Sequence, residues 1–229
     1  MTSTPLQTSD ISIIIPTLNE ETQVGNWGKL PLLAGEVIIV DGGSRDQTVP
    51  LARSSGFRVE SCNPGRGGQL NHGARSAKGK ILLFLHADTE LPSDFTGPLL
   101  ACLNTTSTLA GAFSLSVKNA GLPLKCITLL ANLRSRLLQL PYGDQGIFIR
   151  RDDFLRLGGF PEAPIMEDFI FIKRARKEGR ITTLPQSVTT SARRWNRLGV
   201  IRTTLINQLV ILGYYARIPL QKLASLYRR

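Results

Sequence analysis

Three groups of acidic residues in this sequence lie next to apolar or helical segments, where an α/β protein binds its ligands. Asp88 follows the apolar run at 80–85, and Asp41 ends a second apolar run. Glu167 and Asp168 precede a helical pattern further along the chain. A carboxylate at the end of a buried strand can hold a divalent cation against a bound substrate. The spacing of the three groups suits one site of this kind.

The elements that must position these residues alternate in the first half of the chain. The pattern predicts strands at 11–16, 36–40, 57–61 and 81–85, and helices from 20 to about 33, from 44 onward and at 69–77. Ser44 is expected to cap the second helix, with Asp46 in its first turn. Such alternation predicts a parallel sheet that helices cover on both faces. Ligands bind beyond the carboxyl ends of such strands.

The second half has a different pattern. Residues 110–117 alternate between polar and apolar, which predicts a half-exposed and antiparallel strand. An amphipathic helix is predicted over 122–140. The remaining segments predict strands at 146–150 and 181–184, and helices at 168–178, 199–216 and 220–227.

Length, cysteine content and charge set limits on the protein class. A chain of 229 residues suits one α/β domain. Its three cysteines, Cys62, Cys102 and Cys126, fit neither a disulfide framework nor a zinc site. Residues 1–116 hold 8 basic and 10 acidic side chains, a net charge of −2, whereas residues 117–229 hold 20 and 7, a net charge of +13. The basic half indicates an anionic partner, either membrane phosphate or nucleic acid, although a solvated basic face fits as well.

The start of the chain and two uncharged stretches bear on targeting and on contact with a membrane. No secretory signal is visible in the first twelve residues, so we expect a cytoplasmic protein. The uncharged stretch 95–117 is interrupted by Pro98, and 203–216 is shorter than the ~20 residues of a spanning helix. The second stretch lies between Arg202 and Arg217. It could rest on the inner face of a membrane or dock on the domain.

Each candidate group fits a structural as well as a chemical role. Asp41 could accept a hydrogen bond from a nucleotide base or ribose, or merely form a tight turn with Gly42. The glycine-rich loop 62–68 with Arg66 could seat an anion, but it lacks the Lys and Ser/Thr of an ATP-binding P-loop. Asp168 could be a general base or a plain helix cap.

Two further groups have the same ambiguity. Asp88 can coordinate Mg²⁺ or Mn²⁺ together with substrate phosphates. His86 could be a second ligand, a hydrogen-bonding imidazole or a structural histidine. Arg193, Arg194 and Trp195 place two guanidiniums beside an indole, which suits a diphosphate and a stacked sugar or acceptor, or a basic surface patch.

Taken together, these motifs resemble the family 2 glycosyltransferases, over roughly residues 11–195. The resemblance rests on IIIPTLNE at 13–20, VIIVDGGS at 37–44, Arg66 with NHG at 71–73, LHAD at 85–88, GDQG at 143–146, Glu167-Asp168 and Arg194-Trp195. His86 stands where the family has the first Asp of its D-x-D metal motif, so only Asp88 carries over as a metal ligand. Ser191 stands where the Q-x-x-R-W signature has its Gln. The sequence therefore resembles compact, non-processive members of the family.

The resemblance implies a GT-A fold, a Rossmann-like, mostly parallel α/β sheet flanked by helices, with an antiparallel acceptor-side extension and C-terminal helices. It implies one domain: a nucleotide-sugar-binding half at about 11–116, an acceptor half at about 117–195, and a basic helical extension at about 196–229. The implied activity is metal-dependent, inverting transfer from a nucleoside diphosphate sugar, most often a UDP-sugar, to a lipid or small-molecule acceptor.

The resemblance also assigns roles to residues, with Mn²⁺ or Mg²⁺ as the cofactor. Asp168 is the expected general base and Asp88 the expected metal ligand. The nucleotide sugar is expected at Pro16, Thr17, Asn19, Glu20, Asp41, Gly42, Arg66 and Asp88, and the acceptor or diphosphate at Asp144, Gln145, Glu167, Arg194 and Trp195.

Three other functions compete with this interpretation. A sugar-phosphate nucleotidyltransferase would use a related sheet, but no Lys-bearing glycine loop follows the first strand. A nucleic-acid-binding module would use the basic half, which has few aromatics among its arginines, so no nucleic acid is expected. A catalytically inactive sugar-nucleotide sensor has the same sequence features.

Overall fold

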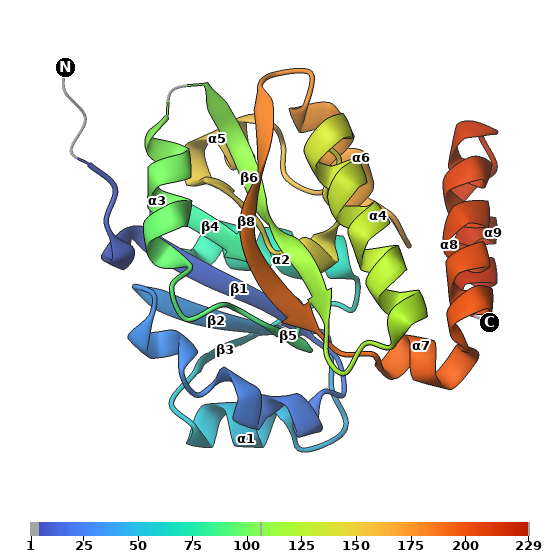
Figure 1. Cartoon of the computed structure of the whole chain (residues 1–229). Coiled ribbons are helices and arrows are strands. Elements are labelled where there is room, and N and C mark those ends of the chain that lie inside the picture. The colour runs from blue at the N-terminus through green and yellow to red at the C-terminus, as the bar shows by residue number, and fades with distance from the viewer. Residues whose placement is uncertain (1–4, 106, 229) are drawn as a thin grey trace.

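A computed structural model describes residues 5–105 and 107–228 of the chain. Within them the strands are β1 (Ile11–Thr17), β2 (Glu36–Asp41), β3 (Arg58–Ser61), β4 (Ile81–Phe84), β5 (Thr89–Glu90), β6 (Thr108–Val117), β7 (Ile147–Arg150) and β8 (Arg180–Thr190). They form one eight-stranded sheet in the order β3-β2-β1-β4-β7-β6-β8-β5 (Figure 1). The first four strands are mutually parallel, and β7 runs antiparallel between β4 and β6. The expected GT-A type of sheet with an antiparallel extension is confirmed.

Helices cover both faces of the sheet. They are α1 (Thr48–Ser54), α2 (Arg66–Ser76), α3 (Thr96–Asn104), α4 (Leu122–Leu138), α5 (Arg151–Arg156), α6 (Glu167–Ala175), α7 (Arg193–Leu198), α8 (Val200–Tyr215) and α9 (Leu220–Arg228), with 3-10 helices η1 (Thr8–Asp10), η2 (Glu21–Trp27), η3 (Leu30–Leu32) and η4 (Gly143–Gln145). Alternate residues of β1 supply the two cores, because successive strand side chains point to opposite faces. Ile13 packs in the core with Trp27, and Ile14 packs in the core with Phe154 and Phe171.

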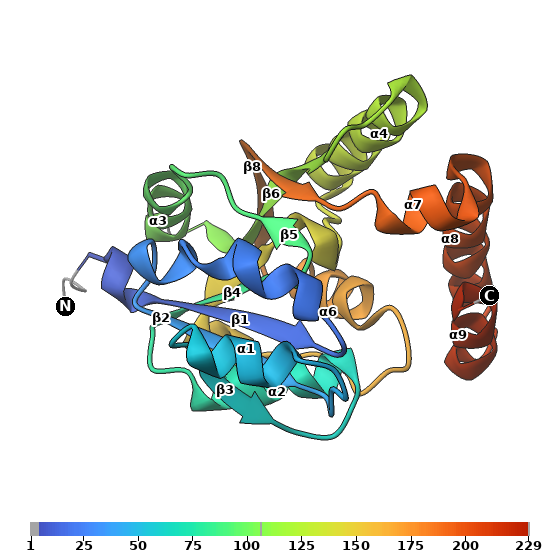
Figure 2. The ribbon, with the colours of Figure 1, turned by 90° about the horizontal axis from the view of Figure 1, so that it is seen from below.

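A helical hairpin of α8 and α9 completes the chain. It stands at the edge of the molecule in both views, linked to the sheet by α7 (Figures 1 and 2). Met166 and Phe169 near the start of α6 form a third apolar cluster with Ile206, Val210 and Leu223 of the hairpin. The hairpin is therefore anchored beside the first turn of α6, where the sequence predicts a catalytic carboxylate.

Two helices differ from the sequence-based expectation. The segment 20–33 forms the short 3-10 helices η2 and η3 in place of one longer helix. Helix α1 begins at Thr48, so the prediction that Ser44 caps it is wrong. Asp46 instead accepts hydrogen bonds from the backbone N–H and hydroxyl of Thr48, at 3.0 and 2.5 Å. The Ser44 hydroxyl is held by a carboxylate in its own turn, which removes it from the helix.

Strand β6 also differs, because it is buried on both faces along nearly its whole length. Its polar–apolar alternation predicts a half-exposed strand, but α3 and α4 cover it. It is antiparallel to β7, as expected, and parallel to β8. The described part of the chain contains no helix that is both long and apolar enough to cross a bilayer.

Candidate active site

Three strand ends meet at one edge of the sheet. The register aligns Thr17 of β1 with Asp41 of β2, and Ile14 with Phe84 of β4. The loops that follow these strands therefore emerge together, as the parallel arrangement requires. The loop after β4 carries Asp88, and the loop after β1 carries Glu20.

The Asp41 carboxylate organises the turn that follows β2. It is only 3% exposed and accepts hydrogen bonds from the backbone N–H groups of Gly43 and Ser44 at 2.8 and 2.9 Å. The hydroxyls of Ser44 and Thr17 donate to its other oxygen at 2.5 and 3.3 Å. Asn19 ties the loop after β1 to the same turn, since its N–H donates to the Ser44 hydroxyl at 2.8 Å.

We expect Asp41→Ala to destabilise the protein, because four donors would lose their acceptor in a buried place. The free energy of unfolding should fall by about 1–3 kcal/mol, the usual penalty for leaving buried donors unpaired. Urea unfolding would measure it, with Asp94→Ala as the control because Asp94 is exposed. Equal unfolding midpoints for wild type and Asp41→Ala would contradict this role.

A cavity of about 380 Å³ opens beside this edge of the sheet. Residues from both halves of the chain and from the C-terminal hairpin line it. Its lining comprises Pro16, Glu20, Arg66, His86, Ala87, Asp88, Tyr142, Asp144, Ile165, Met166, Asp168, Phe169, Thr190, Ser191, Arg193, Arg194, Trp195, Asn207, Val210, Ile211 and Tyr227. The mixture of carboxylates, guanidiniums and apolar side chains suits a charged substrate that also has an uncharged part.

Asp88 enters the cavity from the loop after β4. Its carboxylate is 22% exposed and lies 3.9 Å from a guanidinium nitrogen of Arg193. The Arg193 guanidinium lies closer to Glu20, to which it donates two hydrogen bonds, at 3.1 and 2.9 Å. Burial raises the pKa of Asp88, Arg193 opposes that rise, and Glu20 adds to it. The carboxylate therefore lies where an added cation would be favourable.

Asp168 reaches the cavity from the first turn of α6. Met166, with φ of 66°, turns the chain sharply into this helix. The two oxygens of Asp168 accept hydrogen bonds from the N–H groups of Gly143, at 2.5 Å, and Phe169, at 2.7 Å. A Cβ at Gly143 would lie 3.0 Å from Asp168 and 2.9 Å from the His86 ring. The absence of a side chain at Gly143 thus allows this close approach.

Glu167 is not part of the cavity lining. It is 3% exposed, and its carboxylate lies 3.4 Å from the guanidinium of Arg66, which does line the cavity. Burial raises the pKa of Glu167, Asp168 raises it further, and Arg66 opposes both. The buried Glu167 carboxylate therefore pairs with the Arg66 guanidinium and helps to hold it in place.

The glycine-rich loop has a packing role next to Arg66. A Cβ at Gly67 would lie 2.5 Å from the carbonyl oxygen of Pro161, so glycine is required where α2 packs on that segment. The amide of Gln69 donates to the carbonyls of Thr17 and Val40 at 2.9 and 2.8 Å. The loop thus fixes α2 to the strand ends and directs Arg66 into the cavity.

His86 and Asp144 are two further titratable groups in the lining. Burial, together with the Arg66 guanidinium, lowers the pKa of His86 to about 3, so the imidazole is neutral. Burial raises the pKa of Asp144 to about 6. Its Oδ1 is buried and has no hydrogen-bond partner among the described residues. An acidic side chain in this state can accept a hydrogen bond from a bound ligand.

The two adjacent arginines have different partners. The Arg194 guanidinium stacks 3.4 Å above the Tyr227 ring and donates to the Tyr227 carbonyl at 2.9 Å. Arg193 instead lies between Glu20 and Asp88. Trp195 lines the cavity, and its ring N–H is buried without a partner among the described residues.

The structure divides the predicted site residues into two sets. Those that line the cavity are Pro16, Glu20, Arg66, Asp88, Asp144, Asp168, Arg194 and Trp195. Those that lie outside its lining are Thr17, Asn19, Asp41, Gly42, Gln145 and Glu167. Gln145 is fully buried, and its amide bridges the Phe113 carbonyl and the Arg134 guanidinium. The second set shapes the loops that carry the first.

Sequence reasoning missed Tyr142, Asn207 and Tyr227, which also line the cavity. Tyr142 directly precedes the GDQG segment, and that position could have drawn attention to it. Asn207 and Tyr227 come from α8 and α9, and no local motif marks them. Only the packing of the hairpin on α6 brings them to the cavity.

The sequence of the first half matches a known family. A sequence model described as "Glycosyl transferase family 2" matches residues 12–119. The glucosyl-3-phosphoglycerate synthase of Mycolicibacterium smegmatis is 33% identical over 111 residues, which is 40% of this chain and 37% of that protein. The enzyme of the same name from Mycobacterium tuberculosis H37Rv is 33% identical over 109 residues, 39% of this chain and 34% of that protein. The matched part thus spans little more than a third of these relatives.

Solved structures share the fold over most of the chain. Staphylococcus aureus TarS 1–349 has a TM-score of 0.64 and 21% identity, covering 86% of this chain and 65% of that one. The M. tuberculosis glucosyl-3-phosphoglycerate synthase in complex with Mg²⁺ and UDP has a TM-score of 0.58 and 20% identity, covering 86% and 78%. At these identities the likeness establishes the fold.

Proposed function

We propose that the chain is a family 2 glycosyltransferase, since the model of that family matches residues 12–119, and that it transfers a sugar, with inversion, from a nucleoside diphosphate sugar to a lipid or small-molecule acceptor. One observation carries the proposal: a single cavity brings Asp88 of the first half together with Asp168 of the second. In the proposed division of labour, the half at 11–116 binds the donor. The half at 117–195 then activates the acceptor.

The proposed donor is a UDP-sugar. Structures of the related M. tuberculosis synthase contain UDP with Mg²⁺ or Mn²⁺. Asp88 fits such a cation, because Mg²⁺ in proteins commonly takes one or two carboxylates and completes its shell with phosphates and water. Among the residues described here, no three His, Cys, Asp or Glu side chains cluster as a metal site, which agrees with a shell that the substrate completes. When bound, the cation neutralises charge on the leaving diphosphate.

The arginines of the cavity supply further positive charge. We assign the diphosphate to Arg193 and Arg66 in preference to Arg194, since Tyr227 already occupies the guanidinium of Arg194. Arginine suits this role because its planar fork binds two phosphate oxygens at once. Arg193 can change partners from Glu20 to a phosphate because it is exposed and reaches both Glu20 and Asp88.

Asp168 is the proposed general base. It would take the proton from an acceptor hydroxyl while that oxygen attacks the anomeric carbon. The bond from the anomeric carbon to the diphosphate breaks, and the electron pair leaves with the diphosphate. Hydrogen bonds from Gly143 and Phe169 orient both oxygens of Asp168 for this step. The neutral His86 and the unpartnered Asp144 can hydrogen-bond sugar hydroxyls beside it.

The acceptor side combines apolar and cationic groups. Ile165, Met166 and Phe169 line the cavity with Trp195, whose indole can stack on a sugar or on an apolar acceptor. The related synthase has been solved with phosphoglyceric acid, a small anion. A lipid or small acceptor with an anionic group would match this mixture.

Thermal-shift measurements with Mn²⁺ and a panel of nucleoside diphosphates test the donor assignment. UDP with Mn²⁺ should raise the melting temperature, since a ligand at about 100 times its Kd adds ~2.7 kcal/mol of stability. Incubation with UDP-sugars should then release UDP. Release of pyrophosphate from UTP and a sugar phosphate would instead identify a nucleotidyltransferase, and no shift with any nucleotide would contradict donor binding.

A further inference from the structure

Helix α4 carries most of its leucines on the outside of the protein, with Leu124 buried. Leu122, Leu129, Leu130, Leu133, Leu137 and Leu138 are each between 50% and 75% exposed. Leu129, Leu133 and Leu137 follow one another at intervals of four residues, so they form a continuous row along one face. A surface helix usually turns its apolar row toward the core, and α4 does the opposite.

Two polar side chains of α4, Asn132 and Ser135, face the domain and hold the helix in this orientation. The Asn132 amide accepts from the N–H of Leu115 at 2.7 Å and donates to its carbonyl at 3.0 Å. Ser135 is fully buried and shares a hydrogen bond of 2.6 Å with Thr183. The outward leucines are therefore a consequence of specific inward contacts, and the helix cannot rotate without breaking them.

A second apolar row lies on α8. Ile201, Leu205, Leu209, Leu212 and Tyr215 are between 51% and 77% exposed. Figures 1 and 2 place α4 and the α8–α9 hairpin on the same flank of the molecule. Another face of α8 lines the cavity with Asn207 and Val210. We call the two rows together the apolar flank, and it lies beside the candidate active site.

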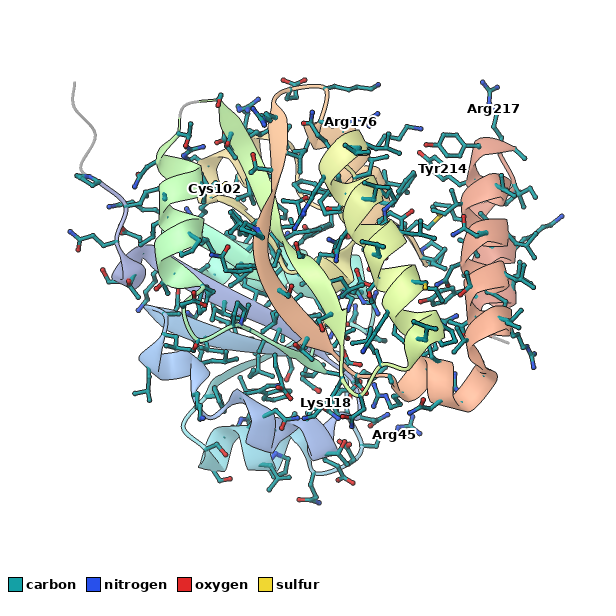
Figure 3. The ribbon with its side chains drawn as sticks, viewed as in Figure 1. Arg45, Cys102, Lys118, Arg176, Tyr214 and Arg217 are labelled. Carbon is teal, nitrogen blue, oxygen red and sulfur yellow. The ribbon has the colours of Figure 1, made fainter. Side chains whose placement is uncertain are left out.

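The helices of the apolar flank carry only positive charges. Segments 95–143 and 179–229, which contain α4, α8 and α9, hold no Asp or Glu. Lys125 lies on α4, Arg202 on α8, and Lys222 on α9. Figure 3 shows Arg217 at the end of α8 pointing away from the domain. Exposed apolar rows with cations and without anions match a surface of anionic lipid.

We propose that the apolar flank docks on an anionic lipid bilayer, with the leucine rows of α4 and α8 among the acyl chains and the flanking cations at the phosphates. A second copy of the chain fits the apolar flank less well. Two paired flanks would place cations of one copy against cations of the other, and the helices of the flank have no carboxylates to pair with them. The proposal stands apart from the glycosyltransferase assignment. It would place the active-site cavity next to the membrane surface.

Vesicle flotation tests the proposal with the whole chain. Wild type should float with vesicles of phosphatidylcholine and phosphatidylglycerol, and far less with phosphatidylcholine alone. Added salt should reduce the recovery, since it screens the cations. Equal recovery in the soluble fraction with both vesicle types would overturn the proposal, whatever the UDP thermal shift shows.

Substitutions locate the contact. The triple variant Leu129→Gln, Leu133→Gln, Leu137→Gln should lower the vesicle partition coefficient at least about tenfold, as should Leu205→Gln with Leu209→Gln on α8. The matched control, Leu32→Gln, Leu51→Gln, Leu155→Gln, changes exposed leucines outside the flank and should float like wild type. Far-UV circular dichroism and a cooperative melting transition confirm folding of every variant.

Light scattering after gel filtration tests whether a second copy of the chain binds to the apolar flank. Wild type is expected to be monomeric without lipid. A wild-type dimer that the α4 triple variant converts to a monomer, with no vesicle binding by either protein, would assign the flank to self-association and overturn lipid docking.

Discussion

The Asp168→Asn protein is expected to bind UDP as wild type does and to transfer sugar to a hydroxyl acceptor about 10²–10⁴-fold more slowly, the usual contribution of a general base. Asparagine keeps the size of the side chain and can still accept the hydrogen bond from Gly143, but it cannot take a proton. The measurement is kcat with saturating donor and acceptor, together with the UDP-dependent rise in melting temperature. A lower kcat with an unchanged thermal shift separates loss of chemistry from loss of binding.

A suitable control for Asp168→Asn is Asp152→Asn. Asp152 also lies in the first turn of a helix, α5, but it is exposed and remote from the cavity. Its substitution should leave kcat within about twofold, as is usual for surface changes. Wild-type kcat in Asp168→Asn would remove Asp168 from the mechanism.

Asp88→Ala should have the second large effect, through the donor. Loss of the proposed cation ligand removes several kcal/mol of stabilisation of the departing diphosphate, which corresponds to about 10³-fold or more in turnover. The Mn²⁺-dependent part of the UDP thermal shift should disappear as well. Chelation of the metal in the wild-type protein should reproduce both losses.

Glu90→Gln is the matched control for Asp88→Ala. Glu90 lies two residues further on, is exposed, and pairs with Lys118 outside the cavity. It should retain activity and the Mn²⁺ effect. If Asp88→Ala kept a wild-type Mn²⁺-dependent shift, the cation would have to bind elsewhere.

Much of the fold could be predicted from the sequence because local patterns determine it. The strands β1, β2 and β4 appear as unbroken apolar runs, and each lies within one or two residues of its predicted bounds. A strand buried on both faces needs apolar side chains at every position, so its signal is continuous. The same runs place Asp41 at the carboxyl end of β2 and Asp88 a few residues beyond that of β4.

Features that depend on distant contacts could not be predicted. The alternation in β6 resembles a half-exposed strand, but Ser114 is buried and its hydroxyl bonds to the Leu184 carbonyl. Helix α4 is amphipathic in sequence, yet only its contacts with β6 and β8 show that Asn132 and Ser135 lie on its inner side. Periodicity identifies a face without saying what lies against it.

The candidate site, like the fold, could be predicted only in part from the sequence. Residue type and position along the chain made Asp88 and Asp168 candidates, and the resemblance to family 2 glycosyltransferases then gave them their expected roles. The resemblance assigned Arg194 to the acceptor or diphosphate, but the sequence could not show how the partners of Arg194 differ from those of its neighbour Arg193. Tyr227, 33 residues beyond Arg194, occupies one guanidinium, and Glu20, 173 residues before Arg193, holds the other near Asp88.

The sequence by itself therefore determined the order of the strands along the chain, the carboxylates at their ends and the basic character of the second half. Tertiary structure alone decided three other features. The Asp41 carboxylate accepts its hydrogen bonds within its own turn, the C-terminal hairpin lines the cavity, and most leucines of α4 face outward. The physical reason is the distance along the chain over which each interaction acts. Backbone preference and hydrophobic period act over a few neighbouring residues, whereas the partners of a buried carboxylate, guanidinium or helix face come from segments that meet only when the chain has folded.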